Sequence, residues 1–288
     1  MGAAFAATRP PPPPAAYVTI HCVEHPSSPG SARSSRVRIA LAGVAALVVA
    51  IPIAAGVLIS GGSSTPQATA SSTFKAVPVT HAQSRRSGPA GHGALVALVT
   101  HATPLRVAPA GHRLALLPNH TEFGSPEALW VVRQSGPWLG VVSPLAGNGR
   151  VGWIARSAAT LNRVTWEIQV SLSSRRLAVL DSGKVVRRYT IAVGAPGSPT
   201  PTGRFAVTDR LLTGNPSGPY GCCIVALSAR SPHAIQGWAG GNRIAIHSTP
   251  ETSSIGHPVS HGCMRLTLAE GRWLLDHVPL GTPTIIRA

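Results

Sequence analysis

The chain has 288 residues, of which 44% are hydrophobic and 5% aromatic, and it contains 30 glycines and 27 prolines. This length allows about two domains, and so many glycines and prolines argue against a helical bundle or a coiled coil and favour short strands joined by many turns. The formal net charge of +16 indicates attraction to polyanions, but the scattered arginines and the lack of a recognition motif favour membrane surfaces or anionic cell-wall polymers over nucleic acid.

The N-terminal part of the chain predicts a membrane anchor. Residues 1–38 are rich in Pro, Ala and Ser, which is typical of a disordered tail. Residues 39–60 run for 22 positions without a charge, and at about 1.5 Å per residue they are long enough to cross a hydrocarbon core of about 30 Å. Three arginines precede this segment, so we expect a cytoplasmic tail, a single transmembrane helix and an exported C-terminal part. The alternative is a signal peptide cleaved near residues 68–70.

A small β domain is expected after a flexible linker. The linker, residues 61–93, is rich in Ser, Thr, Ala, Gly and Pro. Residues 94–161 contain five short apolar stretches separated by turn residues such as Pro104 and Gly147-Asn148-Gly149, which predicts a small antiparallel barrel. Residues 136–157 resemble the strand pair of a bacterial SH3-like domain, with Trp138 and Trp153 as its tryptophans. We expect both tryptophans to fill a core, and the alternative is a groove for a wall peptide or a docking face.

Residues 164–288 are expected to form a second, mostly β domain. Ile168, Val170 and Leu172 alternate with polar residues, which predicts a strand with one buried face. Asp181-Ser182-Gly183 predicts a hairpin connection. Residues 204–211 and 242–248 read as further strands, and residues 267–278 as the single convincing helix.

The residues with reactive side chains concentrate in one segment of this second domain. His247, His257, His261 and Cys263 lie within 17 residues. The segment resembles the catalytic domain of the L,D-transpeptidases, the YkuD family, whose mark is a histidine at a strand end followed by Ser/Thr-His-Gly-Cys, here residues 260–263. Thr-Pro-Thr-Gly at residues 200–203 and Gly-Pro-Tyr-Gly at residues 218–221 match further family motifs. The resemblance implies a β-sandwich catalytic domain.

The resemblance also implies the role of each residue in the motif. It makes Cys263 the nucleophile, because a thioester divides acyl transfer into two easier steps, and it makes His247 the base that takes the thiol proton. It gives His261 a part in shaping the pocket and binding substrate. Gly262 is expected to let the backbone approach closely, so that N–H groups near Cys263 form an oxyanion hole.

Other residues of the segment have two interpretations each. Ser248 and Ser260 are candidates to orient the imidazoles. Arg265 is expected either to hold a substrate carboxylate or to anchor the loop through a salt bridge. Tyr220 either lines the cleft or fills the core, and His257 is expected to be an exposed loop residue.

We expect neither a metal nor a cofactor. The histidines and Cys263 match no zinc spacing. Three cysteines are exported on this topology, and Cys222 and Cys223 are adjacent. Because a bond between neighbours departs from ordinary disulfide geometry, two packed free thiols are the favoured interpretation.

The function that follows from the resemblance is cell-wall cross-linking. The expected partners are peptidoglycan stem peptides: Cys263 attacks the third residue of a tetrapeptide stem, the terminal D-alanine leaves, and an amine of another stem resolves the thioester. The resemblance further implies that a carbapenem acylates Cys263. The alternatives are a thiol-dependent hydrolase of wall peptides and a non-catalytic wall-binding protein.

Overall fold

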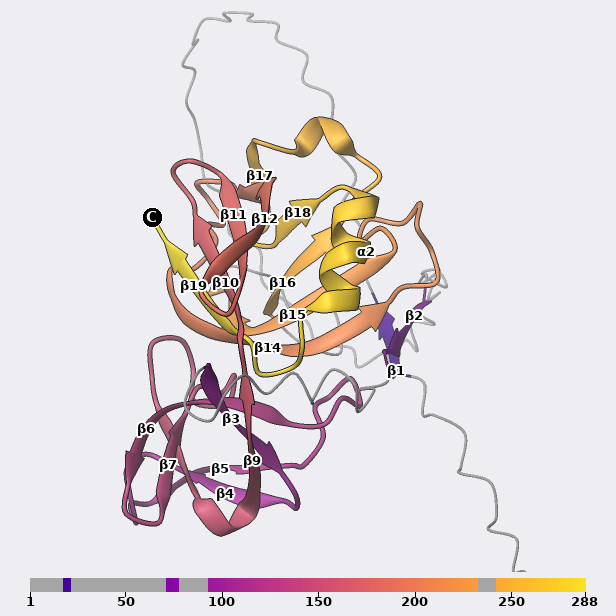
Figure 1. The fold of residues 1–288 in the computed structure, drawn as a ribbon. Coiled ribbons are helices and arrows are strands. Elements are labelled where there is room, and N and C mark those ends of the chain that lie inside the picture. The colour runs from indigo at the N-terminus through magenta and orange to yellow at the C-terminus, as the bar shows by residue number, and fades with distance from the viewer. Residues whose placement is uncertain (1–17, 22–70, 78–92, 233–241) are drawn as a thin grey trace, which may run out of the picture. The chain divides into compact units, whose positions relative to one another are not determined.

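A computed structural model describes residues 18–21, 71–77, 93–232 and 242–288 (Figure 1). The chain divides into two compact units, Met1–Cys22 with Ser71–Ala288 and Val23–Ala70, and every described residue belongs to the first. The predicted membrane segment, residues 39–60, lies outside the described residues. So do most of the predicted tail and linker, apart from β1 (Val18–His21), which pairs with β2 (Ser71–Ala76). In the described ranges, no helix has both the length and the apolar character needed to cross a membrane.

Residues 94–164 form a seven-stranded sheet. All five predicted apolar stretches are strands, and two further strands complete the sheet in the order β5-β4-β8-β7-β6-β3-β9. The elements are β3 (Ala94–Val99), β4 (Thr103–Arg106), β5 (Arg113–Leu117), β6 (Ala128–Ser135), β7 (Trp138–Val141), β8 (Gly152–Ala155), the 3₁₀ helix η1 (Arg156–Ala158) and β9 (Ala159–Val164). Apart from η1, the regular secondary structure described in this region is therefore all β, as predicted.

Two expectations about this sheet are wrong. Pro104 does not mark a turn but lies inside β4. Because β4 pairs with β8 only at Arg106, Pro104 stands where one side of the strand is unpaired, a position that proline tolerates.

Trp138 and Trp153 do not fill the core. Their neighbours Leu139 and Ile154 take the buried face, so the alternation of the strands leaves both tryptophans half-buried on the other face.

Residues 165–288 form a second β region with one described helix. Its strands are β10 (Trp166–Ser171), β11 (Arg176–Asp181), β12 (Lys184–Thr190), β13 (Val193–Gly194), β14 (Gly203–Leu212), β15 (Cys223–Arg230), β16 (Arg243–Ser248), β17 (Pro258–Ser260), β18 (Met264–Leu266) and β19 (Pro283–Arg287). The main sheet has the order β12-β11-β10-β19-β14-β15-β16-β18, and β13 pairs with β17 separately. The mainly β class is thereby confirmed.

The main sheet curves around its own core. Ile168 and Leu177 lie on strands near one end of the sheet order, and Ile246 and Met264 lie at the other end, yet all four share one buried cluster. Strands so far apart in a sheet reach a common core only if the sheet bends back on itself. The expected alternation of β10 is confirmed, since Trp166, Ile168 and Val170 are buried and the residues between them are partly exposed.

Local signals in the sequence account for the hairpin and the helix. Ser182 and Gly183 connect β11 to β12 with φ values of 51° and 76°, the left-handed pair that a type I′ hairpin requires. Helix α2 (Leu268–His277) begins with a capping box in which the Thr267 side chain accepts from the Glu270 N–H, while the Glu270 side chain accepts from the Thr267 N–H. Figure 1 shows α2 against β15 and β16, where it buries Leu274 and Leu275.

Candidate active site

The predicted nucleophile and base lie at one edge of the main sheet. Strand β16 ends with His247 and Ser248, and it pairs in parallel with β18, which follows Cys263 directly. The Ala245 N–H donates a hydrogen bond of 3.4 Å to Cys263 Sγ. Ala245 and His247 are two residues apart on one strand and therefore face the same side of the sheet. The segment after β16 thus folds back and brings the thiol onto the face that carries the imidazole.

The backbone fixes the proton position on His247. The side chain is buried, and its Nδ1 lies 2.8 Å from the carbonyl oxygen of Ser248. A carbonyl only accepts hydrogen bonds, so Nδ1 carries the proton and Nε2 keeps its lone pair. The Tyr220 ring packs edge-on against the imidazole with centroids 5.0 Å apart, which restricts ring rotation. His247 therefore presents Nε2 as a base.

Burial keeps both groups neutral in the resting protein. Together with the charge of Arg265, and against the hydrogen bond to the Ser248 carbonyl, it lowers the pKa of His247 to about 4. Burial also raises the pKa of the Cys263 thiol, although the Ala245 N–H and Arg265 both favour the thiolate. The resting site thus holds a neutral thiol and a neutral imidazole.

Hydrogen bonds hold the turn that carries Cys263 in place. Ser260 Oγ donates to the Cys263 carbonyl at 2.5 Å and accepts from the Gly262 N–H at 3.1 Å. Thr200 Oγ1 donates to the Gly262 carbonyl at 2.8 Å and accepts from the Gly194 N–H at 2.9 Å. Ser260 therefore positions the turn rather than an imidazole. Thr200, which sequence reasoning treated only as part of a turn motif, connects that motif to the cysteine.

Gly262 is required at its position. Its φ is +113°, and a Cβ atom there would lie 2.9 Å from Cδ1 of Ile244. The close backbone approach expected from the sequence is therefore present. Because the Gly262 N–H already donates to Ser260, the N–H of Cys263 itself is the remaining candidate donor for an oxyanion at this turn.

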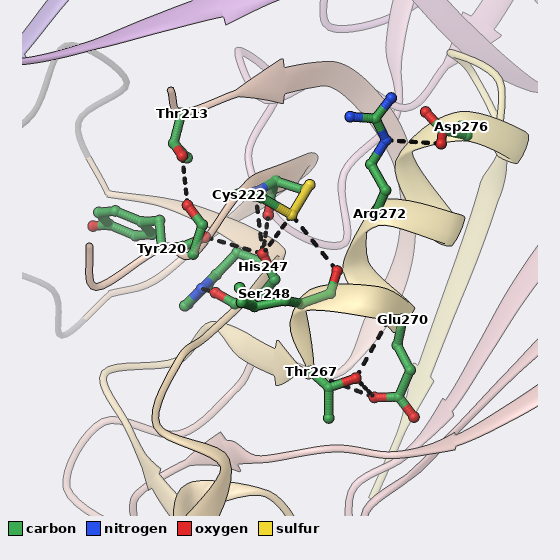
Figure 2. The surroundings of a disulfide bond; sticks show 12 residues. Thr213, Tyr220, Cys222, His247, Ser248, Thr267, Glu270, Arg272 and Asp276 are labelled. Carbon is green, nitrogen blue, oxygen red and sulfur yellow. Dashed lines mark hydrogen bonds and ion pairs between the residues drawn. A yellow bond between two sulfur atoms is a disulfide. The ribbon is translucent and has the colours of Figure 1, made fainter. Parts of the chain in front are cut away.

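Ser248 orients His247 through its carbonyl and not through its hydroxyl. The hydroxyl instead accepts from the Cys223 N–H at 3.1 Å and lies 3.4 Å from Cys222 Sγ, so that Ser248 contacts both the base and the β15 end (Figure 2). Cys222 and Cys223 are joined by a disulfide, which corrects the expectation of two free thiols. Ordinary disulfide geometry disfavoured this bond, but both side chains pack toward the core cluster under α2, where they meet.

The remaining predicted site residues lie farther out. Arg265 Nη1 forms an ion pair of 3.3 Å with the exposed Glu251, which agrees with the interpretation that Arg265 anchors the loop through a salt bridge. His261 is exposed, and its expected role in substrate binding stays a prediction. His257 is exposed, as predicted. Tyr220 packs against a core cluster that also borders Cys263, which agrees with its interpretation as a core residue, and its place in a cleft stays a prediction.

Comparison with known proteins agrees with this geometry. Residues 165–286 match the family model YkuD, the L,D-transpeptidase catalytic domain. The predicted resemblance to this family is confirmed for these residues. The chain is 34% identical over 119 residues to the putative L,D-transpeptidase YkuD of Bacillus licheniformis, which is 41% of this chain and 64% of that protein. It is 31% identical over 126 residues to L,D-transpeptidase 1 of Mycobacterium tuberculosis, 39% of this chain and 47% of that protein. The matched region thus spans less than two thirds of either relative.

Solved structures are less similar to this chain than these relatives are. An L,D-transpeptidase from Mycobacterium smegmatis has a TM-score of 0.36 at 20% identity over 76% of this chain and 89% of that chain. L,D-transpeptidase 3 from Mycobacterium tuberculosis also scores 0.36, at 18% identity over 48% of this chain and 74% of that chain. Scores of this size add no weight to the sequence match.

Proposed function

We propose that the chain is a cell-wall L,D-transpeptidase that forms peptidoglycan cross-links through a thioester on Cys263. The observation that carries the proposal is the pairing of β16 with β18, which brings the thiol to the face of the sheet that carries a histidine whose Nδ1 is committed to the Ser248 carbonyl. A neutral imidazole with a free Nε2 is the base that acyl transfer to a thiol needs. The matched domain and the named relatives support the same reaction.

In the first half-reaction, Cys263 Sγ attacks the carbonyl carbon of the third residue of a tetrapeptide stem. The thiol proton passes to Nε2 of His247, and the carbonyl oxygen becomes an oxyanion facing the Cys263 N–H. The tetrahedral intermediate then collapses with cleavage of the amide bond. The leaving D-alanine nitrogen takes the proton from Nε2, which restores the neutral imidazole and leaves a thioester.

In the second half-reaction, the side-chain amine of another stem attacks the thioester carbonyl. His247 takes a proton from this amine as the new amide bond forms, and the carbon–sulfur bond breaks. The thiolate of Cys263 recovers its proton from the imidazolium. Both charged intermediates are short-lived, because burial of the pair favours the neutral forms.

The test is mass spectrometry of muropeptides after incubation of the full chain with a disaccharide tetrapeptide that contains diaminopimelate. A cross-linked dimer lacking one D-alanine is expected, and the Cys263→Ala variant should give none. Tripeptide without dimer would replace the proposal with the hydrolase alternative. The proposal would be wrong if neither product formed while Cys263 remained reduced.

We also propose that residues 39–60 anchor the chain with its C-terminal part outside the cytoplasm. The length of the apolar stretch and the arginines before it support this topology. The pairing of β1 with β2 is the one observation against it, because a span at residues 39–60 would separate these two strands. Carbonate washing should leave the protein in the membrane fraction, whereas a soluble mature protein beginning near Ser71 would contradict the anchor.

We propose further that residues 94–161 are an SH3-like domain that keeps the chain at the wall. The seven-stranded order and the short turns support a small barrel, and the net charge of +16 suits contact with anionic wall polymers. Co-sedimentation of the full chain with purified walls should weaken as salt increases, because exposed charges are screened. Binding that is independent of salt would contradict the electrostatic part.

A further inference from the structure

Residues 119–127, here called the docking loop, connect β5 to β6 and have a defined shape of their own. The Thr121 N–H donates to the Ser125 carbonyl at 2.8 Å, and Thr121 Oγ1 accepts from the N–H groups of Phe123 and Ser125. Gly124 supplies the left-handed turn residue with a φ of 81°. The loop is therefore a closed turn, held by its own hydrogen bonds, rather than an extended linker.

The docking loop makes buried polar contacts with strands that the YkuD match includes. Thr121 Oγ1 donates to the carboxylate of Asp209 on β14. Glu122 Oε1 lies 2.5 Å from Nη1 of Arg243, the first residue of β16. The Arg243 side chain is fully buried and also donates to the Thr208 hydroxyl. Since a buried charge is stable only when paired and hydrogen-bonded, the docking loop supplies part of what keeps Arg243 in place.

The same loop also makes apolar contact beneath the proposed nucleophile. Phe123 is 4% exposed and belongs to a cluster with Ile224 and Ala245. Cys263 and Tyr220 are packed against this cluster. Because Ala245 also donates its N–H to Cys263 Sγ, Phe123 belongs to the apolar cluster against which the thiol packs.

The strand geometry joins these contacts into one row. Arg243, Ala245 and His247 alternate along β16 and therefore face the same side of the sheet. The docking loop pairs with the first through Glu122 and shares a buried cluster with the second through Phe123, and the third is the proposed base. The loop thus lies along the face of β16 that carries the chemistry, more than 100 residues before it in the sequence.

We propose that Glu122 and Phe123 are positioning residues for the Cys263–His247 pair, so that the domain before the YkuD match completes the active site. The inference rests on the proposed function for the role of the pair. It assigns to residues 119–127 a task that the matched region, residues 165–286, does not contain. A displacement of about 1 Å is enough to lower the rate of an oriented reaction about 100-fold, so loss of the support under Ala245 should be measurable.

The experiment uses the full chain with Phe123→Ala, Phe123→Leu and Glu122→Gln, and it measures two properties of Cys263. The first is the rate of acylation by a carbapenem, followed by intact mass. The second is the pH profile of alkylation by iodoacetamide, followed at the peptide that contains Cys263. We expect Phe123→Ala to slow acylation at least about 10-fold and to move the alkylation profile to lower pH, because water then reaches a thiol whose pKa burial had raised. Phe123→Leu should stay near wild type.

Controls separate positioning from stability and from the proposed function. Glu167→Gln on β10, outside this contact, should change neither readout, and thermal unfolding shows that each variant is folded. If Phe123→Ala does not fold, Glu122→Gln decides, since it keeps the side-chain volume and removes only the charge opposite Arg243. Wild-type acylation and an unchanged profile in the folded variants would overturn the inference. A shifted profile in a chain that turns over no stem peptide would uphold the positioning role and refute the proposed function instead.

Discussion

Replacement of Glu127 by glutamine should change how the stability of the chain depends on pH. Glu127 is 4% exposed at the end of the docking loop. Burial, together with the carboxylates of Asp209 and Glu122 and against the charge of Arg243, raises its pKa to about 8. The unfolded chain releases this proton near pH 4.5, whereas the folded chain holds it until about pH 8. The free energy of unfolding of the wild type therefore falls as the pH rises through this window.

The size of the effect follows from the two pKa values. Each pH unit between them costs about 1.4 kcal/mol, so the wild type loses about 4 kcal/mol between pH 4 and pH 8 through this one group. Glutamine does not titrate. The difference in unfolding free energy between Glu127→Gln and wild type should thus shift by about 4 kcal/mol in favour of the variant over the same range.

Urea unfolding of the full chain at both pH values measures this difference, and groups that titrate in both proteins cancel. Glu167→Gln controls for replacing a carboxyl by an amide outside the cluster. A difference that is the same at pH 4 and pH 8 would refute the reasoning, because it would show that folding does not perturb the Glu127 carboxyl.

The remaining predictions concern the catalytic pair. His247→Ala should slow acylation by a factor of about 10²–10⁴, the usual effect of losing a general base; a harmless substitution combined with an inactive His261→Ala would show that the two roles are reversed. Acylation by the wild type should persist at pH 5 and decline only near pH 4, where His247 becomes protonated, and a decline centred near pH 6.5 would contradict the buried neutral base. One carbapenem equivalent should add to the intact mass and should be absent in Cys263→Ala, so adducts confined to another residue would disprove the site. Gly262→Ala should destabilise the chain by about 1–3 kcal/mol in urea unfolding, because its φ of +113° suits glycine; unchanged stability would show that the turn relaxes.

Local patterns predicted the parts of the fold that neighbouring residues determine. The alternation around Ile168, the turn at Ser182-Gly183 and the helix after Thr267 each depend on a few adjacent residues, and the structure confirms all three. The nucleophile and base came from a motif, and the pairing of β16 with β18 explains why a histidine and a distant cysteine form one site.

Contacts across the chain were the features that the sequence concealed. Nothing in the residue type indicates that Ser248 would orient the base through its carbonyl, because every residue has one. Trp138 points away from the core since Leu139 competes for it, and such competition depends on strand pairing. Glu122 and Arg243 lie 121 positions apart, so no local sequence pattern could predict their ion pair.

The parallel pairing of β16 with β18 has a consequence for the segment between them. The two strands are adjacent in the sheet, so the ladder, together with the Ser260 and Thr200 hydrogen bonds, sets the distance between base and nucleophile. Residues 252–253 and 257–259 are exposed, whereas Glu251 pairs with Arg265. The exposed positions other than Glu251 are therefore where substitutions can change the surface near the proposed pair without altering the ladder that positions it.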